Sequence, residues 1–150
     1  MLNHLPVIGV AFSLALLAWS LWRKNEVLKK TALGALTLVA LLSIPAYVTG
    51  EPSEDAVKSL PGVSASLLEQ HEEVAMVAFT MILGLGGMAL AALLWFRRGK
   101  LIPAWFGYAL LLVSLMVSGM MAWTANLGGQ IRHSEIRANA AQPASHGDRD

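Results

Sequence analysis

Residues 74–96 read VAMVAFTMILGLGGMALAALLWF, an apolar segment without a single charged side chain. A helix needs about 20 such residues to cross the hydrocarbon core of a bilayer. The segment is apolar on every helical face, so it lacks the charged face of a helix on a soluble protein. It also lacks the alternation of polar and apolar residues that a lipid-facing β-strand shows. It therefore predicts a transmembrane helix.

Three further segments share these properties, at residues 5–22, 31–49 and 101–127. With their flanking turns, we expect helices over about residues 5–22, 31–49, 67–96 and 101–133, the third opened by a capping box of Ser66 and Glu69. Short connections make the helices antiparallel within the first and second pairs. The predicted fold is an all-α, integral membrane, antiparallel four-helix bundle over residues 1–137, with a polar C-terminal tail at 138–150.

The composition limits the class of protein in the same way. The 150 residues are 55% hydrophobic and 14% charged, whereas a soluble domain has about 25% charged residues. Cysteine is absent, which excludes disulfide scaffolds and thiolate metal sites. The formal net charge is only +1, so the chain has no strong basic field for nucleic acid. A lipid bilayer is the expected surrounding.

Basic residues predict how the helices are oriented. Seven of the eleven lie in two short loops, whereas nine of the ten acidic residues lie on the other side and only Glu26 does not. The seven are Arg23, Lys24, Lys29, Lys30, Arg97, Arg98 and Lys100. Because cytoplasmic loops of membrane proteins are enriched in Lys and Arg, both chain ends are expected outside. We therefore expect a multi-pass protein of the bacterial cytoplasmic membrane.

Histidine marks the outer side of this bundle. His4 begins the first span, His71 begins the third helix, and His133 follows the fourth span; His146 lies in the tail. Helical spacing puts each of the first three on a face of small or polar residues. These faces are His4, Ile8, Ala11, Ala15 and Ala18; His71, Ala75 and Ala78; and Gly119, Ala122, Asn126, Gly129 and His133. Small residues allow close approach of a helix or flat cofactor, so these faces are predicted to point inward.

A histidine-bound haem b is the first hypothesis for this site, and it makes the protein a membrane electron-transfer component. Two histidines, first of all His71 and His133, then His4, clamp the iron. The Gly129/Ala122 face, which includes Asn126, and the Ala75/Ala78 face make room for the macrocycle. Arg132 or Arg137 meets the propionates through charge-assisted hydrogen bonds.

Two other hypotheses fit the same residues. A mono- or dinuclear iron, copper or zinc site draws on the three histidines and on nearby carboxylates. Its ligand set is His4, His71, His133, Glu51, Glu72 and Glu135. The other alternative is a cofactor-free accessory subunit that packs against a larger membrane complex. No residue is assigned to catalysis, and enzymatic activity stays open.

Several motifs resemble an uncharacterised family of small bacterial four-span membrane proteins, classed as a domain of unknown function. The motifs are NHLP at residues 3–6, TGEP at 49–52, LPGV at 60–63, HEE at 71–73 and WTANLGGQIRH at 123–133. The resemblance covers about residues 1–137 and implies four helices with both ends outside. Many relatives have a second histidine in the first motif, where this chain has only His4.

The resemblance also implies a functional setting. Relatives in that family sometimes carry Rieske iron–sulfur or c-type cytochrome domains in the same chain. That association favours electron transfer over transport, with subunits of a redox complex or a quinone as partners. It supplies no established catalytic residue.

Overall fold

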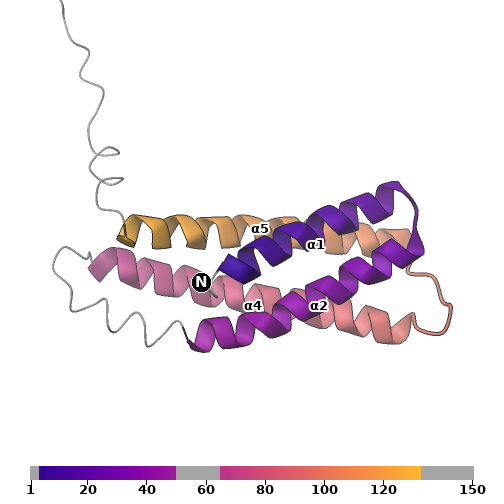
Figure 1. Ribbon diagram of the computed structural model, residues 1–150, viewed down its shortest axis with the longest axis horizontal. Helices are drawn as coiled ribbons and strands as arrows, with labels where there is room; N and C mark the ends of the chain where they lie inside the picture. Colours follow the sequence, from indigo (N-terminus) through magenta and orange to yellow (C-terminus); the bar gives the residue numbers. More distant parts are fainter. Residues whose placement is uncertain (1–3, 50–64, 133–150) are drawn as a thin grey trace, which may run out of the picture.

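The computed structural model describes residues 4–49 and 65–132 of the chain. These residues fold into α-helices joined by short connections and contain no strand. The helices are α1 (His4–Trp22), α2 (Glu26–Val48), α4 (Ala65–Trp95) and α5 (Ala104–Arg132), drawn in Figure 1. The all-α fold predicted from the apolar segments is confirmed.

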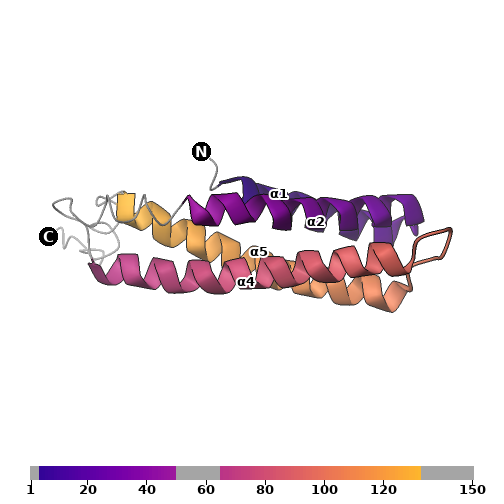
Figure 2. The same ribbon diagram turned by 90° about the horizontal axis from the view of Figure 1, so that it is seen from below.

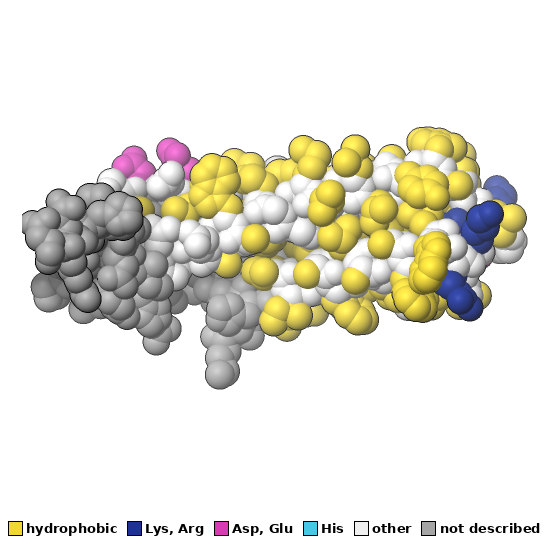
Figure 3. Space-filling view, turned by 90° about the horizontal axis from the view of Figure 1, so that it is seen from above, with side chains coloured by type: hydrophobic (Ala, Val, Ile, Leu, Met, Phe, Trp, Pro, Cys, Tyr) yellow, Lys and Arg dark blue, Asp and Glu magenta, His cyan; other side chains and the backbone are white. Residues whose placement is uncertain are grey.

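All four of these helices are long and apolar enough to cross a membrane. Their outer surface is apolar as well, with large side chains such as Ile8, Phe12, Leu94, Leu112 and Met116 more than 40% exposed. A soluble monomer rarely exposes contiguous apolar patches beyond a few hundred Å². Figure 3 shows the apolar side chains spread along the length of the molecule. The described chain therefore has the surface of a multi-pass membrane protein.

The helices form a closed ring in which α1 packs against α2 and α5, and α4 packs against the same two helices. Figures 1 and 2 show this arrangement from two directions. The chain turns back at residues 23–25, between α1 and α2, and again at residues 96–103, between α4 and α5. Both turns lie at the same end of the molecule. We call this end, which carries Arg23, Lys24, Arg97, Arg98 and Lys100, the basic end.

Several helix boundaries differ from those predicted. Helix α2 begins at Glu26, five residues early, because the Asn25 side chain accepts a hydrogen bond from Leu28 N–H at 3.1 Å and caps the helix. An N-cap carboxamide satisfies a backbone donor that the first helical turn leaves unpaired. Helix α4 begins at Ala65, and α5 begins at Ala104, directly after Pro103. Proline favours such a start because it has no N–H to lose.

The turn between α1 and α2 is a tight helix cap. The Asn25 N–H donates to Ser20 C=O and the Lys24 N–H donates to Leu21 C=O. This is the pattern of a Schellman motif, in which the residue after the helix adopts a left-handed conformation. Lys24 occupies that position with φ 50°, and in the other short connection Arg98 has φ 60°.

Glycines set the close approach between neighbouring helices. Each of the four interfaces in the ring has one glycine where an added Cβ would meet a side chain of the adjacent helix. The pairs are Gly9 with Val39, Gly86 with Ala40, Gly107 with Leu21, and Gly128 with His71. At Gly86 the added Cβ would overlap Ala40 Cβ and lie 3.4 Å from the Leu36 carbonyl oxygen. Because lipid is as apolar as leucine, such close packing is a main source of helix association in membranes.

Candidate functional site

His71 lies near the start of α4, where that helix contacts the last part of α5. Its ring is partly buried against α5 at Gly128. A Cβ added to that glycine would lie 3.3 Å from the Cε1 atom of the imidazole. The absence of a side chain at position 128 therefore lets the imidazole lie directly against the α5 backbone.

This contact gives the imidazole a backbone partner. The backbone carbonyl of Thr124 lies beside the imidazole and interacts with it. Thr124 precedes Gly128 by four residues, so its carbonyl is the one that the Gly128 N–H meets inside an α-helix. That carbonyl has a second lone pair to offer, and the small glycine leaves it within reach of the ring. The Thr124 hydroxyl instead donates to Met120 C=O at 2.9 Å.

The Thr124 carbonyl is the backbone acceptor beside the His71 ring. In a neutral imidazole one nitrogen is a donor and the other is an acceptor. Donation to a backbone carbonyl selects the tautomer and holds the orientation of the ring, as it does in histidines that bind metals. Glu72, the next residue, is partly buried and interacts electrostatically with His71. The site thus has an oriented imidazole with a carboxylate beside it.

The structure corrects the prediction that the three small-residue faces point inward. Only the His71 face does so: Ala75 is partly buried and Ala78 is 1% exposed. On α1, Ile8 is 67% exposed, and the three alanines of its face are exposed too. They are Ala11, Ala15 and Ala18.

Helix α5 is rotated away from its predicted orientation in the same way. Gly119, Ala122 and Asn126 are exposed, and the inner face is formed by larger or neighbouring residues. Those residues are Leu110, Ser114, Val117, Met121 and Leu127. Small residues are enriched at contacts between membrane helices, which include contacts with another protein, so small size does not by itself mark the interior of this bundle.

Two residues predicted to bind the cofactor therefore lie differently from the expectation. Asn126 accepts a hydrogen bond on its Oδ1 from Gln130 Nε2 at 2.6 Å, at an exposed position on its own helix. Gly129 has no neighbouring atom within 4 Å of an added Cβ, and it is Gly128 that meets His71. Asn126 therefore does not face the interior as expected, and the cofactor-binding roles of Asn126 and Gly129 stay predictions.

The remaining predicted ligands lie at or beyond the limits of the described residues. His133, Glu51 and Glu135 lie outside the described residues, and the structure gives only the helical backbone of His4 and Arg132. Within residues 4–49 and 65–132, no group of three or more His, Asp or Glu side chains is arranged to hold a metal ion. The shared histidine site stays a prediction.

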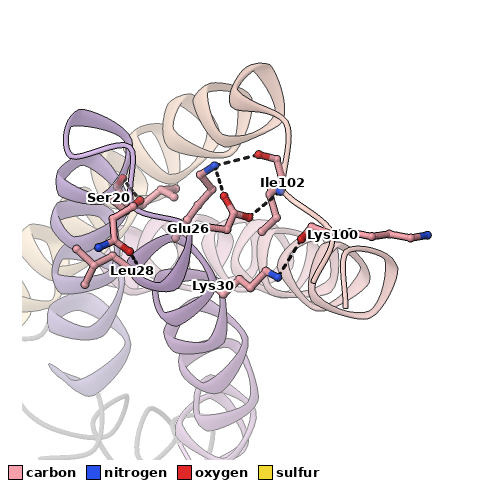
Figure 4. Close-up of polar contacts among 9 residues, drawn as sticks. Ser20, Glu26, Leu28, Lys30, Lys100 and Ile102 are labelled. Atoms are coloured by element: carbon pink, nitrogen blue, oxygen red, sulfur yellow. Dashed lines mark hydrogen bonds and ion pairs between the residues drawn. The ribbon is translucent and has the colours of Figure 1, made fainter. Parts of the chain in front are cut away.

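A second polar cluster, at the basic end, was not anticipated from the sequence. The Lys29 ammonium is 2.8 Å from Glu26 Oε2 and 2.9 Å from the Ile102 carbonyl oxygen. Glu26 Oε1 accepts a hydrogen bond from Ile102 N–H at 2.6 Å. Figure 4 shows these contacts, which join the start of α2 to the connection before α5. We call Glu26, Lys29 and Ile102 the clasp.

Lys29 is buried, with 7% of its surface exposed, although its charge alone predicts a solvated loop residue. The signal in the sequence was Glu26, the one acidic residue among the basic loops, placed three residues before Lys29. That spacing brings two side chains to the same face of a helix. The third member, Ile102, is far away along the chain and contributes only backbone atoms, so the sequence pattern does not reveal it.

No family model, curated protein or solved structure matches the chain. The family resemblance carried by the sequence motifs thus stays a hypothesis, and the functional argument depends on the residues themselves.

Proposed function

We propose that the protein is an integral membrane electron-transfer component with a histidine-bound redox group at its outer end. In this proposal the four helices form an antiparallel bundle in the bacterial cytoplasmic membrane, with both chain ends outside. The apolar length of every described helix supports membrane insertion. The concentration of Lys and Arg in the two short connections supports the orientation.

One observation carries the choice of redox chemistry, which is the placement of the His71 imidazole against the α5 backbone, at Gly128 and beside the Thr124 carbonyl. A histidine that donates to a backbone carbonyl presents its second nitrogen as an acceptor in a fixed direction, which a metal ligand requires. Haem b is the first candidate for the group, and an iron, copper or zinc ion is the alternative. His133 and His4 are the proposed further ligands.

His71 would be one of the residues that hold the haem iron in this proposal, and the packing around His71 limits the space for the group. Close contact between Gly128 and His71 leaves no space for a flat group between α4 and α5 at that level. Further along the bundle, the interior is filled by fully buried residues such as Ile82, Leu85 and Val117. The proposed location is therefore the outer end of α4, beyond the start of α1 (Figure 1). When bound, haem b would supply reversible one-electron transfer.

The test is an optical spectrum of the purified full chain, first air-oxidised and then reduced with dithionite. We expect a Soret band that shifts and sharpens on reduction in the wild type and in the control His146→Ala. His71→Ala should lose the band while keeping its helical circular dichroism. A metal ion without haem would give no Soret band and stoichiometric metal by elemental analysis. Wild-type cofactor content in His71→Ala, or no haem and no metal in the wild type, would contradict the proposal.

A second candidate function is supported by the outward face of α5. Gly119, Ala122 and Asn126 are all exposed, and small or polar residues of this kind usually contact another helix in membranes. The protein would then be an accessory subunit that packs against a partner through α5. Ala122→Trp should dissociate a complex seen by native electrophoresis of mildly solubilised membranes, without lowering helical content. A wild-type chain that migrates alone would exclude this role.

A further inference from the structure

The basic end carries a ring of exposed cations that the fold does not neutralise. Glu26 is the one acidic residue described at this end, and the clasp uses both of its carboxylate oxygens, one for Lys29 and one for Ile102 N–H. Lys30 donates to the Lys100 carbonyl at 3.0 Å. Five basic side chains are left exposed around these contacts. They are Arg23, Lys24, Arg97, Arg98 and Lys100.

The clasp also explains why these cations share one surface. Arg23 and Lys24 come from the first short connection, and the other three come from the second. The bonds from Lys29 to Ile102 and from Lys30 to Lys100 tie α2, directly after the first connection, to the second connection. Figure 3 shows basic side chains at one end of the molecule and acidic side chains at the other. Repulsion among like charges would otherwise favour separation of the two connections.

Tryptophans place this ring at the depth of lipid headgroups. Trp22, Trp95 and Trp105 lie next to the two connections and are each at least 70% exposed. Exposed tryptophan at the end of a membrane span typically lies at the interface between hydrocarbon and headgroups. The neighbouring Lys and Arg side chains are therefore at the level of the lipid phosphates.

The backbone conformation at Lys24 and Arg98 is a second indication that the basic residues of the two connections have a function. Lys24 and Arg98 have φ angles of 50° and 60°, in the left-handed region, where glycine is the residue of lowest conformational cost. A basic residue thus occupies a strained position in each of the two connections. Residues kept in strained conformations concentrate at functional positions.

We propose that the basic end binds the phosphodiester headgroups of anionic phospholipids in the adjacent leaflet. Uncompensated cations at headgroup depth attract anionic lipids, and each Lys or Arg near the surface strengthens that attraction. Anionic lipids are the occupant that brings negative charge to these five side chains, since the described residues of the chain supply none to them. This binding is independent of the proposed redox group at the opposite end.

The exposed tryptophans allow a direct test with the full chain in lipid vesicles. Vesicles contain phosphatidylcholine with an equal fraction of either brominated phosphatidylglycerol or brominated phosphatidylcholine, and bromine quenches nearby tryptophan fluorescence. We expect stronger quenching by the anionic lipid, and a smaller difference at high ionic strength. The decisive variant is Lys24→Gly/Arg98→Gly, which removes two charges and relieves strain at both positions.

This variant should lower the preference for anionic lipid by about fivefold or more, while its melting temperature in uncharged detergent stays the same or rises. The control Lys58→Gln/Arg137→Gln removes the same formal charge from residues in neither short connection, and it should keep the preference. Equal quenching by both lipids in the wild type would overturn the inference. So would an unchanged preference in the glycine variant, or an equal loss in the control.

Discussion

Replacement of Lys29 by methionine tests whether the clasp holds the two helix pairs together at the basic end. Methionine is close to lysine in length, so the change removes the ammonium and leaves the apolar stem. The substitution breaks the ion pair with Glu26 at 2.8 Å and the hydrogen bond to the Ile102 carbonyl at 2.9 Å. It also leaves the Glu26 carboxylate, whose side chain is 23% exposed, without its compensating cation.

The size of the effect follows from the burial of these groups. Removal of one member of a fully buried ion pair costs about 3–5 kcal/mol. Glu26 is more exposed than that case requires and keeps its bond from Ile102 N–H, which reduces the cost. A hydrogen bond to a charged group contributes about 1.5–3 kcal/mol. We therefore expect Lys29→Met to lower the free energy of unfolding by about 2–4 kcal/mol.

The adjacent lysine provides a matched control, because Lys30→Met removes the same charge one residue away. Lys30 makes one exposed hydrogen bond, to the Lys100 carbonyl, so its loss should cost about 0.5–1 kcal/mol. Unfolding is followed by circular dichroism during titration of sodium dodecyl sulfate into detergent micelles. In a double-mutant cycle, Glu26→Gln and Lys29→Met should couple by about 1–3 kcal/mol. Equal effects of the two lysine substitutions, with no coupling to Glu26, would refute the clasp.

Two further predictions each compare a pair of substitutions that should differ in their effect on the free energy of unfolding. Gly86→Ala should lower the free energy of unfolding by about 1–3 kcal/mol, because the new Cβ would overlap Ala40. A Cβ added at Gly87 would meet no atom within 4 Å, so the higher helix propensity of alanine should stabilise α4 by up to about 1 kcal/mol. The same unfolding titration compares the two glycine variants. Stabilisation by both, or destabilisation by both, would contradict the close contact of Gly86 with Ala40. Asn25→Ala should cost about 1 kcal/mol by removing the cap of α2, whereas Asn25→Asp should keep the stability near that of the wild type, and an equal loss in both would show that the cap is not the cause.

The fold class could be predicted because the strongest physical constraint on this chain is local. A backbone inside hydrocarbon must satisfy its own hydrogen bonds, so a long apolar segment such as residues 74–96 has little choice but to become a helix. Helix ends were less predictable. The start of α2 at Glu26 depends on one contact of the Asn25 carboxamide with the Leu28 N–H. The apolar pattern begins only at residue 31, so it does not predict this earlier start.

The orientation of each helix about its own axis could not be predicted in the same way. In water, polar residues mark the outside of a helix, but in lipid both faces can be apolar. The small residues Ala11 and Ala122 therefore gave the wrong faces for α1 and α5, whereas His71 gave the right face for α4. The useful signal was a polar group that requires a partner, since burying it unpaired is costly.

Polar contacts and close helix packing join the helices at different levels of the bundle. In the middle of the spans, hydroxyl groups bond to their own helix: Ser13 to Gly9 C=O, Thr37 to Leu33 C=O, and Ser114 to Leu110 C=O. Such bonds satisfy the hydroxyls without joining one helix to another. Association there depends on glycine contacts, which are sensitive to a single added methyl group.

At the two ends, by contrast, polar side chains join different helices to one another or to a connection. The clasp does so at the basic end, and at the opposite end the partly buried His71 ring of α4 lies against the α5 backbone at Gly128 and Thr124. Three contacts link Glu26, Lys29 and Ile102 in the clasp. They hold the basic end in the arrangement that we propose binds headgroups. The two proposals therefore concern different ends of the bundle: lipid headgroups at the basic end, and the redox group at the end that carries His71.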